Sequence, residues 1–320
     1  MEFLAYIPVP ILLIIGIAAN VGSGVINRYY TKSVSNGMGG FYLFLMITSY
    51  VSAVCIWAVT GFDMKISAYS GIMALIQGVV MVLSATFVLY SIAVGPWAYT
   101  TVITSFSMLI PTLIGTVIWH EHIDALTIAG IVLVAVSIVL SVQKSKKPLP
   151  ESAEAVLDAP QIVKSKVSAK WFVAVIVATI ATGGMGVIQK VHQKSEFRAE
   201  LLPMLAISFA VMGTVFAMLS VIHILKFGKN SLLDNPPQTK SGKTLLFTLI
   251  IVAGLCGMIK NIVNMYLSGV MDSAVFFPLS NGGNLVIVTL LAIFAYKEKL
   301  TVKQWIGVGA GIAAVIFLCL

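Results

Sequence analysis

Ten apolar stretches, each of a length typical of a membrane-spanning helix, dominate this chain of 320 residues. A helix needs about 20 consecutive apolar residues to cross a bilayer, where it satisfies its own backbone hydrogen bonds. Only 10% of the residues are charged and 59% are hydrophobic, which leaves too few polar side chains to cover a water-facing surface. The sequence therefore predicts an all-α, multi-pass integral membrane protein, with the plasma membrane as its expected location, and excludes a soluble enzyme. The stretches run over 4–26, 38–60, 68–94, 97–119, 124–142, 171–191, 201–225, 244–267, 273–296 and 301–320.

Two connections between these stretches are long. Residues 143–170 are rich in Lys, Pro, Ser and Glu and fall at the middle of the chain, as a flexible linker would. Residues 226–243 carry two prolines and are expected to form a solvated loop. The chain is thus predicted to consist of a first five-helix half over 1–142, the linker over 143–170, and a second five-helix half over 171–320.

Internal repetition relates the two halves. Each half holds an odd number of spans, so the second half enters the membrane from the side opposite to the first. The predicted fold is therefore ten transmembrane helices in two inverted five-helix repeats, the architecture of many secondary transporters, which bind substrate near the midplane between the halves. Three matches occur in the same order in both halves. The segment 22–28 (GSGVINR) matches 184–190 (GMGVIQK), and 119–123 (WHEHI) matches 296–300 (YKEKL). Between them, Tyr90, Val94 and Ala98 match Tyr266, Val270 and Ala274.

The stretches 90–130 and 266–311 resemble the tandem domains of EamA-type members of the drug/metabolite transporter superfamily. The features that carry the resemblance in the first half are Gly95-Pro96, Pro111, Glu121 and Gly130. The second half departs from the pattern, because Asp272 stands where the first proline is expected and its helix proline, Pro278, comes earlier. The resemblance implies a transporter and leaves the substrate open.

The acidic and histidine side chains argue against chemistry inside the membrane. All twelve Asp and Glu residues and the four His fall in predicted connections or at span ends. Acid–base or metal-dependent catalysis needs such groups to converge at depth. His120 and His122 flank Glu121 in a short turn, where we expect them to be solvated, and the three cysteines lie far apart in apolar runs. We therefore expect no enzyme activity, no metal and no cofactor, and find no evident proton carrier.

One charged residue, Lys260, lies inside a predicted span. A charge at depth is costly unless it faces protein or water, so it marks a functional site. Asn264 lies one helical turn further on, with Asn261 beside it. The alternative is that Lys260 extends to the nearer membrane surface. We favour a cavity, in which the lysine would select a substrate with an anionic group.

The other candidate substrate-binding residues are polar or aromatic side chains within spans, since a transporter cavity needs uncharged hydrogen-bonding groups. Hydrogen bonding between helices is the alternative role of the asparagines. The two glycines of the segment 280–284 (SNGGN), after Pro278, predict a local break in the ninth helix. The candidates are Asn20, Asn27, Gln77, Trp97, Tyr99, Thr104, Gln189, Asn281 and Asn284.

The net charge of +8 comes from short basic connections rather than from one basic surface, so we expect no nucleic-acid partner. Fifteen Lys and Arg residues lie on the side of the connections between spans 1–2, 5–6, 7–8 and 9–10, and four lie on the other side, Lys260 aside. The positive-inside rule places the fifteen in the cytoplasm and both termini outside. Resemblance to the family implies both termini inside.

These observations predict a secondary transporter that moves a small polar or amphipathic metabolite by alternating access. Its expected partners are the small-molecule substrate and the lipid bilayer. No ATP-binding motif occurs, so an ion or substrate gradient must supply the energy. A membrane channel and a membrane-embedded enzyme or scaffold are the alternatives.

Overall fold

The computed structural model describes residues 2–34, 37–61, 65–94, 100, 103–121, 123–140, 169–228, 232–233, 238–294 and 302–319. Nearly all of these residues are helical, and no strand occurs among them. The linker at 143–168 and the connection around 295–301 lie outside the described residues.

Each of the ten predicted stretches corresponds to a helix in the described part of the chain, with boundaries within a few residues of those expected. The fourth stretch is described continuously from Ile103, where helical residues 103–105 precede the 3-10 turn η1. A short helix, α1, precedes the first span, and a second 3-10 turn, η2, leads into α9. The helices are α1 (Glu2–Ala5), α2 (Val9–Ser33), α3 (Met38–Val59), α4 (Ala68–Val94), η1 (Phe106–Met108), α6 (Leu109–Trp119), α7 (Ala125–Leu140), α8 (Ala169–Gln193), η2 (Arg198–Glu200), α9 (Leu201–Phe227), α10 (Lys240–Val270), α11 (Ser273–Phe294) and α12 (Val302–Cys319).

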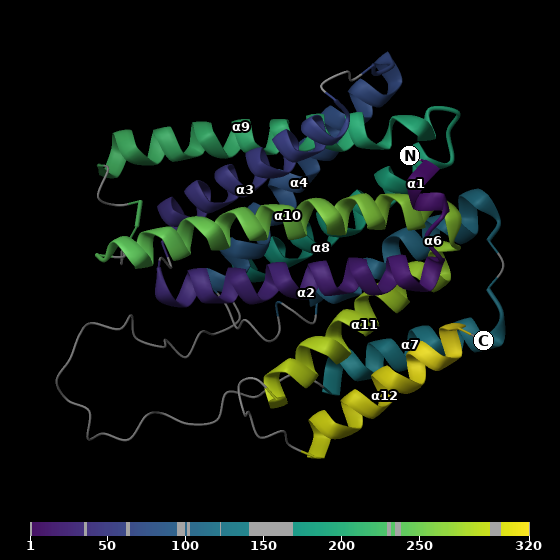
Figure 1. The fold of residues 1–320 in the computed structure, drawn as a ribbon. Helices are drawn as coiled ribbons and strands as arrows, with labels where there is room; N and C mark the ends of the chain where they lie inside the picture. Colours follow the sequence, from purple (N-terminus) through teal and green to yellow (C-terminus); the bar gives the residue numbers. More distant parts are fainter. Residues whose placement is uncertain are drawn as a thin grey trace.

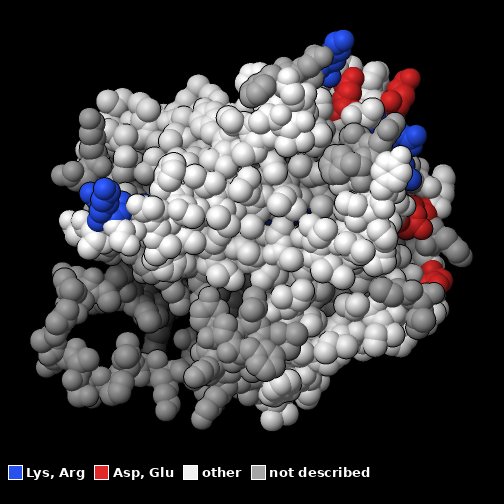
Figure 2. Space-filling view, in the orientation of Figure 1, with Lys and Arg blue, Asp and Glu red and all other residues white. Residues whose placement is uncertain are grey.

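The protein is an all-α, multi-pass integral membrane protein. Six helices, α2, α3, α4, α8, α9 and α10, are long and apolar enough to cross a bilayer. Their outward faces carry exposed large apolar side chains, including Trp57, Phe172 and Ile222, as expected where lipid replaces water. On the face shown in Figure 2, nearly all charged atoms lie at the two ends of the helix bundle, and the surface between them is uncharged.

Helices from the two parts of the chain interleave. Extensive contacts join α3 with α9, α4 with α8, and α2 with α10, so each of these pairs contains one helix from before the linker and one from after it. The helices α7 and α12 form a further pair beside the main bundle (Figure 1). Ten helices thus correspond to the ten predicted stretches in the described part of the chain, and six of them are long and apolar enough to cross a bilayer.

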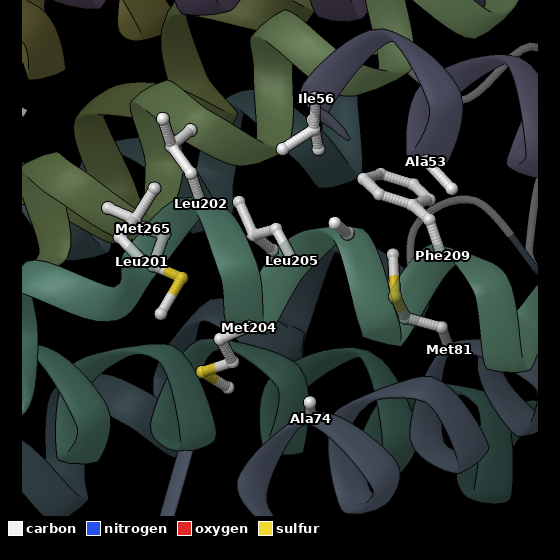
Figure 3. Packing of buried hydrophobic residues seen from close by; sticks show 11 residues of the cluster. Ala53, Ile56, Ala74, Met81, Leu201, Leu202, Met204, Leu205, Phe209 and Met265 are labelled. Atoms are coloured by element: carbon white, nitrogen blue, oxygen red, sulfur yellow. The ribbon is translucent and has the colours of Figure 1, made fainter. Parts of the chain in front are cut away.

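A core of buried apolar residues fixes this interleaving. Ile56 of α3, Ala74 of α4, Leu205 of α9 and Met265 of α10 belong to one buried cluster (Figure 3). Helix association in lipid depends on close packing rather than on exclusion of water. A cluster with members from four helices therefore holds the two parts of the chain together.

The bundle has two ends, which we name by what lies there. The termini end holds both chain termini (Figure 1), the turn between α6 and α7, the end of α8, and the turn between α10 and α11. The far end is where α2 ends and α3 begins, and where α9 ends and α10 begins. At the far end, the tilted rings of Tyr30 and Phe44 pack with centroids 4.4 Å apart, and the Tyr30 hydroxyl donates a hydrogen bond to the Gly40 carbonyl at 2.8 Å.

The predicted break in the ninth span is wrong, because α11 runs without interruption from Ser273 to Phe294 with Pro278 inside it. Pro278 is the sixth residue of α11, so it removes one backbone hydrogen bond of the helix without ending it. The glycines that follow serve close packing instead. A Cβ on Gly283 would lie 2.7 Å from Ile17 Cδ1 of α2, and one on Gly282 would lie 3.2 Å from Val134 Cγ2 of α7.

Candidate functional site

Two cavities lie between the helices and share Lys260 and Asn261. Cavity A has a volume of about 210 Å³ and extends from Lys260 toward the far end, where Asn27 and Phe44 line it. Cavity B has a volume of about 120 Å³ and extends from Lys260 toward the termini end, where Gln189 and Phe277 line it. The polar residues of cavity A are Ser23, Asn27, Thr48, Ser49, Ser52, Lys260 and Asn261, and those of cavity B are Asn20, Ser107, Thr182, Gln189, Lys260, Asn261, Asn264, Ser280 and Asn281.

Lys260 stands where the two cavities meet. It lies about 15 Å before the end of α10 at about 1.5 Å per residue, which is close to half the thickness of a bilayer core of about 30 Å. Among the described residues, none forms a hydrogen bond or an ion pair with its ammonium group, and no Asp or Glu lines either cavity. The junction of the cavities thus holds one basic side chain with no acidic partner in the described part of the chain.

Amide side chains surround this lysine. Asn261 Nδ2 donates to the Gly257 carbonyl of its own helix at 2.8 Å, and its Oδ1 accepts from Gln189 Nε2 of α8 at 3.5 Å. Asn281 Nδ2 donates to the Phe277 carbonyl at 2.9 Å. Amides that are held in this way present their remaining donors and acceptors in fixed directions. The site can therefore hydrogen-bond a polar ligand beside the lysine.

The structure brings together most of the predicted site residues and separates the others. Asn20, Asn264, Asn281 and Gln189 line cavity B, and Asn27 lines cavity A. Asn284 is partly buried in α11 and is absent from both linings.

Three further predicted site residues either line neither cavity or lie outside the described residues. Thr104 donates its hydroxyl to the Thr100 carbonyl of the same helix at 2.9 Å, which is the local bond that hydroxyl side chains readily form. Trp97 and Tyr99 lie outside the described residues.

Gln77 is fully buried in α4 and lines neither cavity. Neither its Nε2 nor its Oε1 has a hydrogen-bond partner among the described residues. Such an amide loses its bonds to water without replacement and lowers stability.

The expectation that Lys260 is the single charge within a span is wrong. Lys190 lies inside α8, is fully buried, and forms an ion pair with Glu121 of the turn between α6 and α7. The side chains of this pair are 1% and 4% exposed, respectively. Glu121 lies in a connection between helices, as predicted, yet its neighbours in space bury it.

The Lys190–Glu121 pair also binds the turn between α10 and α11. Lys190 Nζ donates to the Met271 carbonyl at 2.9 Å, and Glu121 Oε2 accepts from the Ser273 backbone N–H at 2.7 Å. Ser273 is the first residue of α11, so the carboxylate also meets the positive end of that helix dipole. The Trp119 ring lies 5.9 Å from Lys190 Nζ, which adds a cation–π contact.

Local geometry directs Glu121 inward. His120 ends α6 in the left-handed region, with a φ of 52°, which reverses the chain before Glu121. Gly115 leaves the space that the carboxylate occupies, because a Cβ there would collide with Glu121 Oε2 and would lie 2.6 Å from Ser273 Oγ. His120 itself is exposed, and no cluster that could hold a metal ion occurs among the described residues.

A sequence signal for this pair exists in the repeat. The segments 22–28 and 184–190 match Arg28 to Lys190, and the segments 119–123 and 296–300 match Glu121 to Glu298. A basic residue thus recurs at the end of the first span of each half, and an acidic residue recurs before the last span. Glu298 and the side chain of Arg28 lie outside the described residues.

Comparison with known proteins identifies the fold alone. No known protein family matches the sequence, and no curated protein is significantly similar to it. A solved structure described only as "Crystal structure of protein" superposes with a TM-score of 0.66 at 12% identity, over 97% of this chain and 95% of that one. The chain therefore shares a complete fold with a protein of experimentally determined structure.

Proposed function

We propose that this protein is a secondary transporter that moves a small metabolite with an anionic group by alternating access. In this proposal, residues 1–142 and 171–320 form two inverted five-helix halves of the EamA type, within the drug/metabolite transporter superfamily. The protein acts in the plasma membrane, with the substrate bound at the junction of cavities A and B.

The pattern of helix contacts supports two equivalent halves. Exchange of the first five spans with the second five turns the contact of α2 with α10 into that of α8 with α4. It also turns the contact of α3 with α10 into that of α9 with α4, and the contact of α2 with α11 into that of α8 with α6. All of these contacts are present in the structure. The pairs α3 with α9, α6 with α11, and α7 with α12 each map onto themselves. The contacts of α11 with α12, of α10 with α8 and of α11 with α7 have no counterpart of similar extent among the described residues.

The observation that carries the proposal is the unpartnered Lys260 at the cavity junction. Two unit charges about 4 Å apart interact by about 4 kcal/mol at an effective dielectric constant near 20. This term favours a carboxylate or phosphate ligand and opposes a cationic one. A ligand that supplies the missing counter-charge also removes the cost of holding an unpaired charge at depth.

The size of the cavities favours a small ligand. Sites for drug-sized molecules have volumes of about 300–1,000 Å³. Cavities of about 210 and 120 Å³ together reach only the lower end of that range. A metabolite with one or two charged or hydrogen-bonding groups fits such a site better than a lipid or a long peptide.

A channel and a membrane-embedded enzyme or scaffold are the competing functions. In proteoliposomes, saturable uptake that supports counterflow would favour the transporter, and flux that does not saturate would favour the channel. Formation of a new compound without net movement would favour the enzyme.

The central experiment compares Lys260→Met, which keeps the length of the side chain, with Lys260→Arg, which keeps the charge. Lys243→Met is the matched control, because Lys243 is an exposed lysine of the same helix. Purified proteins are screened by thermal shift against carboxylates, phosphate esters and amines, and the ligands found are then tested for counterflow. We expect affinity for the anionic ligand to fall by about tenfold to a thousandfold in Lys260→Met. Smaller losses are expected in Lys260→Arg, and none in the control. Stabilisation by amines instead of anions, or unchanged affinity in Lys260→Met, would refute the proposed substrate class.

A further inference from the structure

We propose that the Lys190–Glu121 ion pair is a gate that closes the transport path at the termini end. This inference rests on the proposed transport function and assigns a role to residues outside the substrate site. The structure shows cavities that reach from Lys260 toward both ends of the bundle, with a bonded cluster only a few residues beyond the lining of cavity B.

The position of the cluster relative to cavity B is the first step. Gln189, which lines cavity B, directly precedes Lys190 in α8. Phe276 and Phe277 also line it, one helical turn after Ser273, whose N–H binds Glu121. Cavity B thus ends where the ion pair begins.

The packing between the cavity and the pair is tight. A Cβ on Gly186 of α8 would lie 2.8 Å from Phe277 Cε1 of α11 and 3.3 Å from Pro111 Cγ of α6. Three helices therefore approach one another at the termini side of cavity B. A ligand at Lys260 could leave in this direction only if α6, α8 and α11 separated.

The ion pair and its hydrogen bonds hold those same three helices together. Glu121 follows α6 and binds the N-terminus of α11, and Lys190 of α8 binds both Glu121 and the end of α10. In terms of the proposed halves, Glu121 belongs to the first half and its partners belong to the second. Separation of the halves at this end requires the pair to break.

Cavity A has the opposite character. It lies between α2, α3, α4, α9 and α10, and its lining reaches Asn27, which is exposed near the far end. The structure thus corresponds to a state that is closed at the termini end and accessible from the far end. Alternating access requires a second state in which the closed end opens, so the Lys190–Glu121 pair is formed in one state and broken in the other.

The test measures access to cavity B from each side of the membrane without any substrate. In full-length protein whose three native cysteines are replaced by alanine, Ser280→Cys places a thiol in cavity B, and Ser23→Cys places one in cavity A. A membrane-impermeant maleimide is added from one side or the other, in intact cells and in inverted vesicles. The gate is perturbed by Glu121→Gln, by Lys190→Met, and by both together, since the double variant leaves no unpaired buried charge.

We expect the unperturbed protein to react at Ser280→Cys from the far-end side and only slowly from the termini side. In the double variant, labelling from the termini side should rise by about tenfold or more, as expected when a state-stabilising contact is lost. Ser23→Cys should show no such rise. Lys194→Met, at an exposed position at the end of α8, is the matched control and should leave both rates unchanged.

Two results would overturn the gate. One is equal labelling of Ser280→Cys from both sides before any perturbation. The other is unchanged labelling from the termini side in the double variant together with a lower melting temperature, which would mean that the pair only stabilises the fold. If Glu121→Gln or Lys190→Met alone fails to fold, the double variant still decides the question. Because labelling needs no substrate, failure of the transport assays would leave this result interpretable.

Discussion

Two glycines of α10, one helical turn apart, meet different surroundings and allow the packing of the bundle to be tested. A Cβ on Gly254 would lie 2.8 Å from Val51 Cγ1 and 2.9 Å from the Thr48 carbonyl oxygen of α3. A Cβ on Gly257 would have no neighbour within 4 Å, although both glycines line cavity A. Alanine at Gly254 therefore forces α3 and α10 apart, whereas alanine at Gly257 only adds a methyl group to the cavity.

The comparison of Gly254→Ala with Gly257→Ala isolates the packing energy. Replacement of glycine by alanine inside a helix is favourable by about 1 kcal/mol, and this gain is common to both variants. Inserting a methyl group into a packed interface costs about 1–3 kcal/mol. The Thr48 carbonyl is backbone and cannot move away by a change of rotamer. We therefore expect Gly254→Ala to be less stable than Gly257→Ala by about 1–3 kcal/mol.

Thermal unfolding in detergent at one fixed heating rate measures this difference, since unfolding of such a protein is often irreversible. At about 2–4 °C per kcal/mol, the melting temperatures should differ by roughly 2–12 °C. Equal melting temperatures, or a lower value for Gly257→Ala, would mean that α3 and α10 do not approach each other closely at Gly254.

Three further predictions follow from other features. Gln77→Leu should leave the free energy of unfolding unchanged or raise it by about 1 kcal/mol, because the buried amide has no partner in the described part of the chain. Marked destabilisation in detergent would show that the amide has hydrogen-bond partners. Trp171→Phe should lower the free energy of unfolding by about 0.5–1.5 kcal/mol, because Trp171 Nε1 donates to Thr100 Oγ1 at 3.0 Å. Unchanged thermal stability would contradict this bond. A C-terminal reporter that is active only in the cytoplasm should be inactive if the basic connections face the cytoplasm, and strong activity would reverse this orientation.

The helices were predictable because the signal for a span is local. A run of apolar residues that ends at Pro, Gly or charged residues predicts a membrane helix without knowledge of its neighbours. The division of the chain into ten stretches therefore agrees with the structure to within a few residues at most of the helix ends. The break expected after Pro278 failed because Gly282 and Gly283 provide close approach to other helices, which sequence alone does not distinguish from flexibility.

The types of residue in the site were predictable from the sequence, but which of them face a cavity was less predictable. Gln77 and Gln189 have the same side chain inside a span, yet only Gln189 faces a cavity. Which face of a helix meets a cavity depends on its packing partners, and these come from distant parts of the chain. The burial of Lys190 and Glu121 escaped prediction for the same reason, because the turn that buries them is far away in sequence.

The pairing of helices across the linker has a consequence for the order of assembly during synthesis. The main packing partners are α8 for α4, α9 for α3, and α10 for α2. Of these three helices, α2 is synthesised first and its partner is synthesised last. Each helix can enter the bilayer alone, because its backbone is internally bonded, but its packing partners arrive only later. The helix α7 finds its main partner in α12, the last helix of the chain, and the Ser137 hydroxyl donates to the Gly307 carbonyl at 2.6 Å. A nascent chain that stops before α12 therefore carries a complete set of inserted early helices and an unfinished interface on α7.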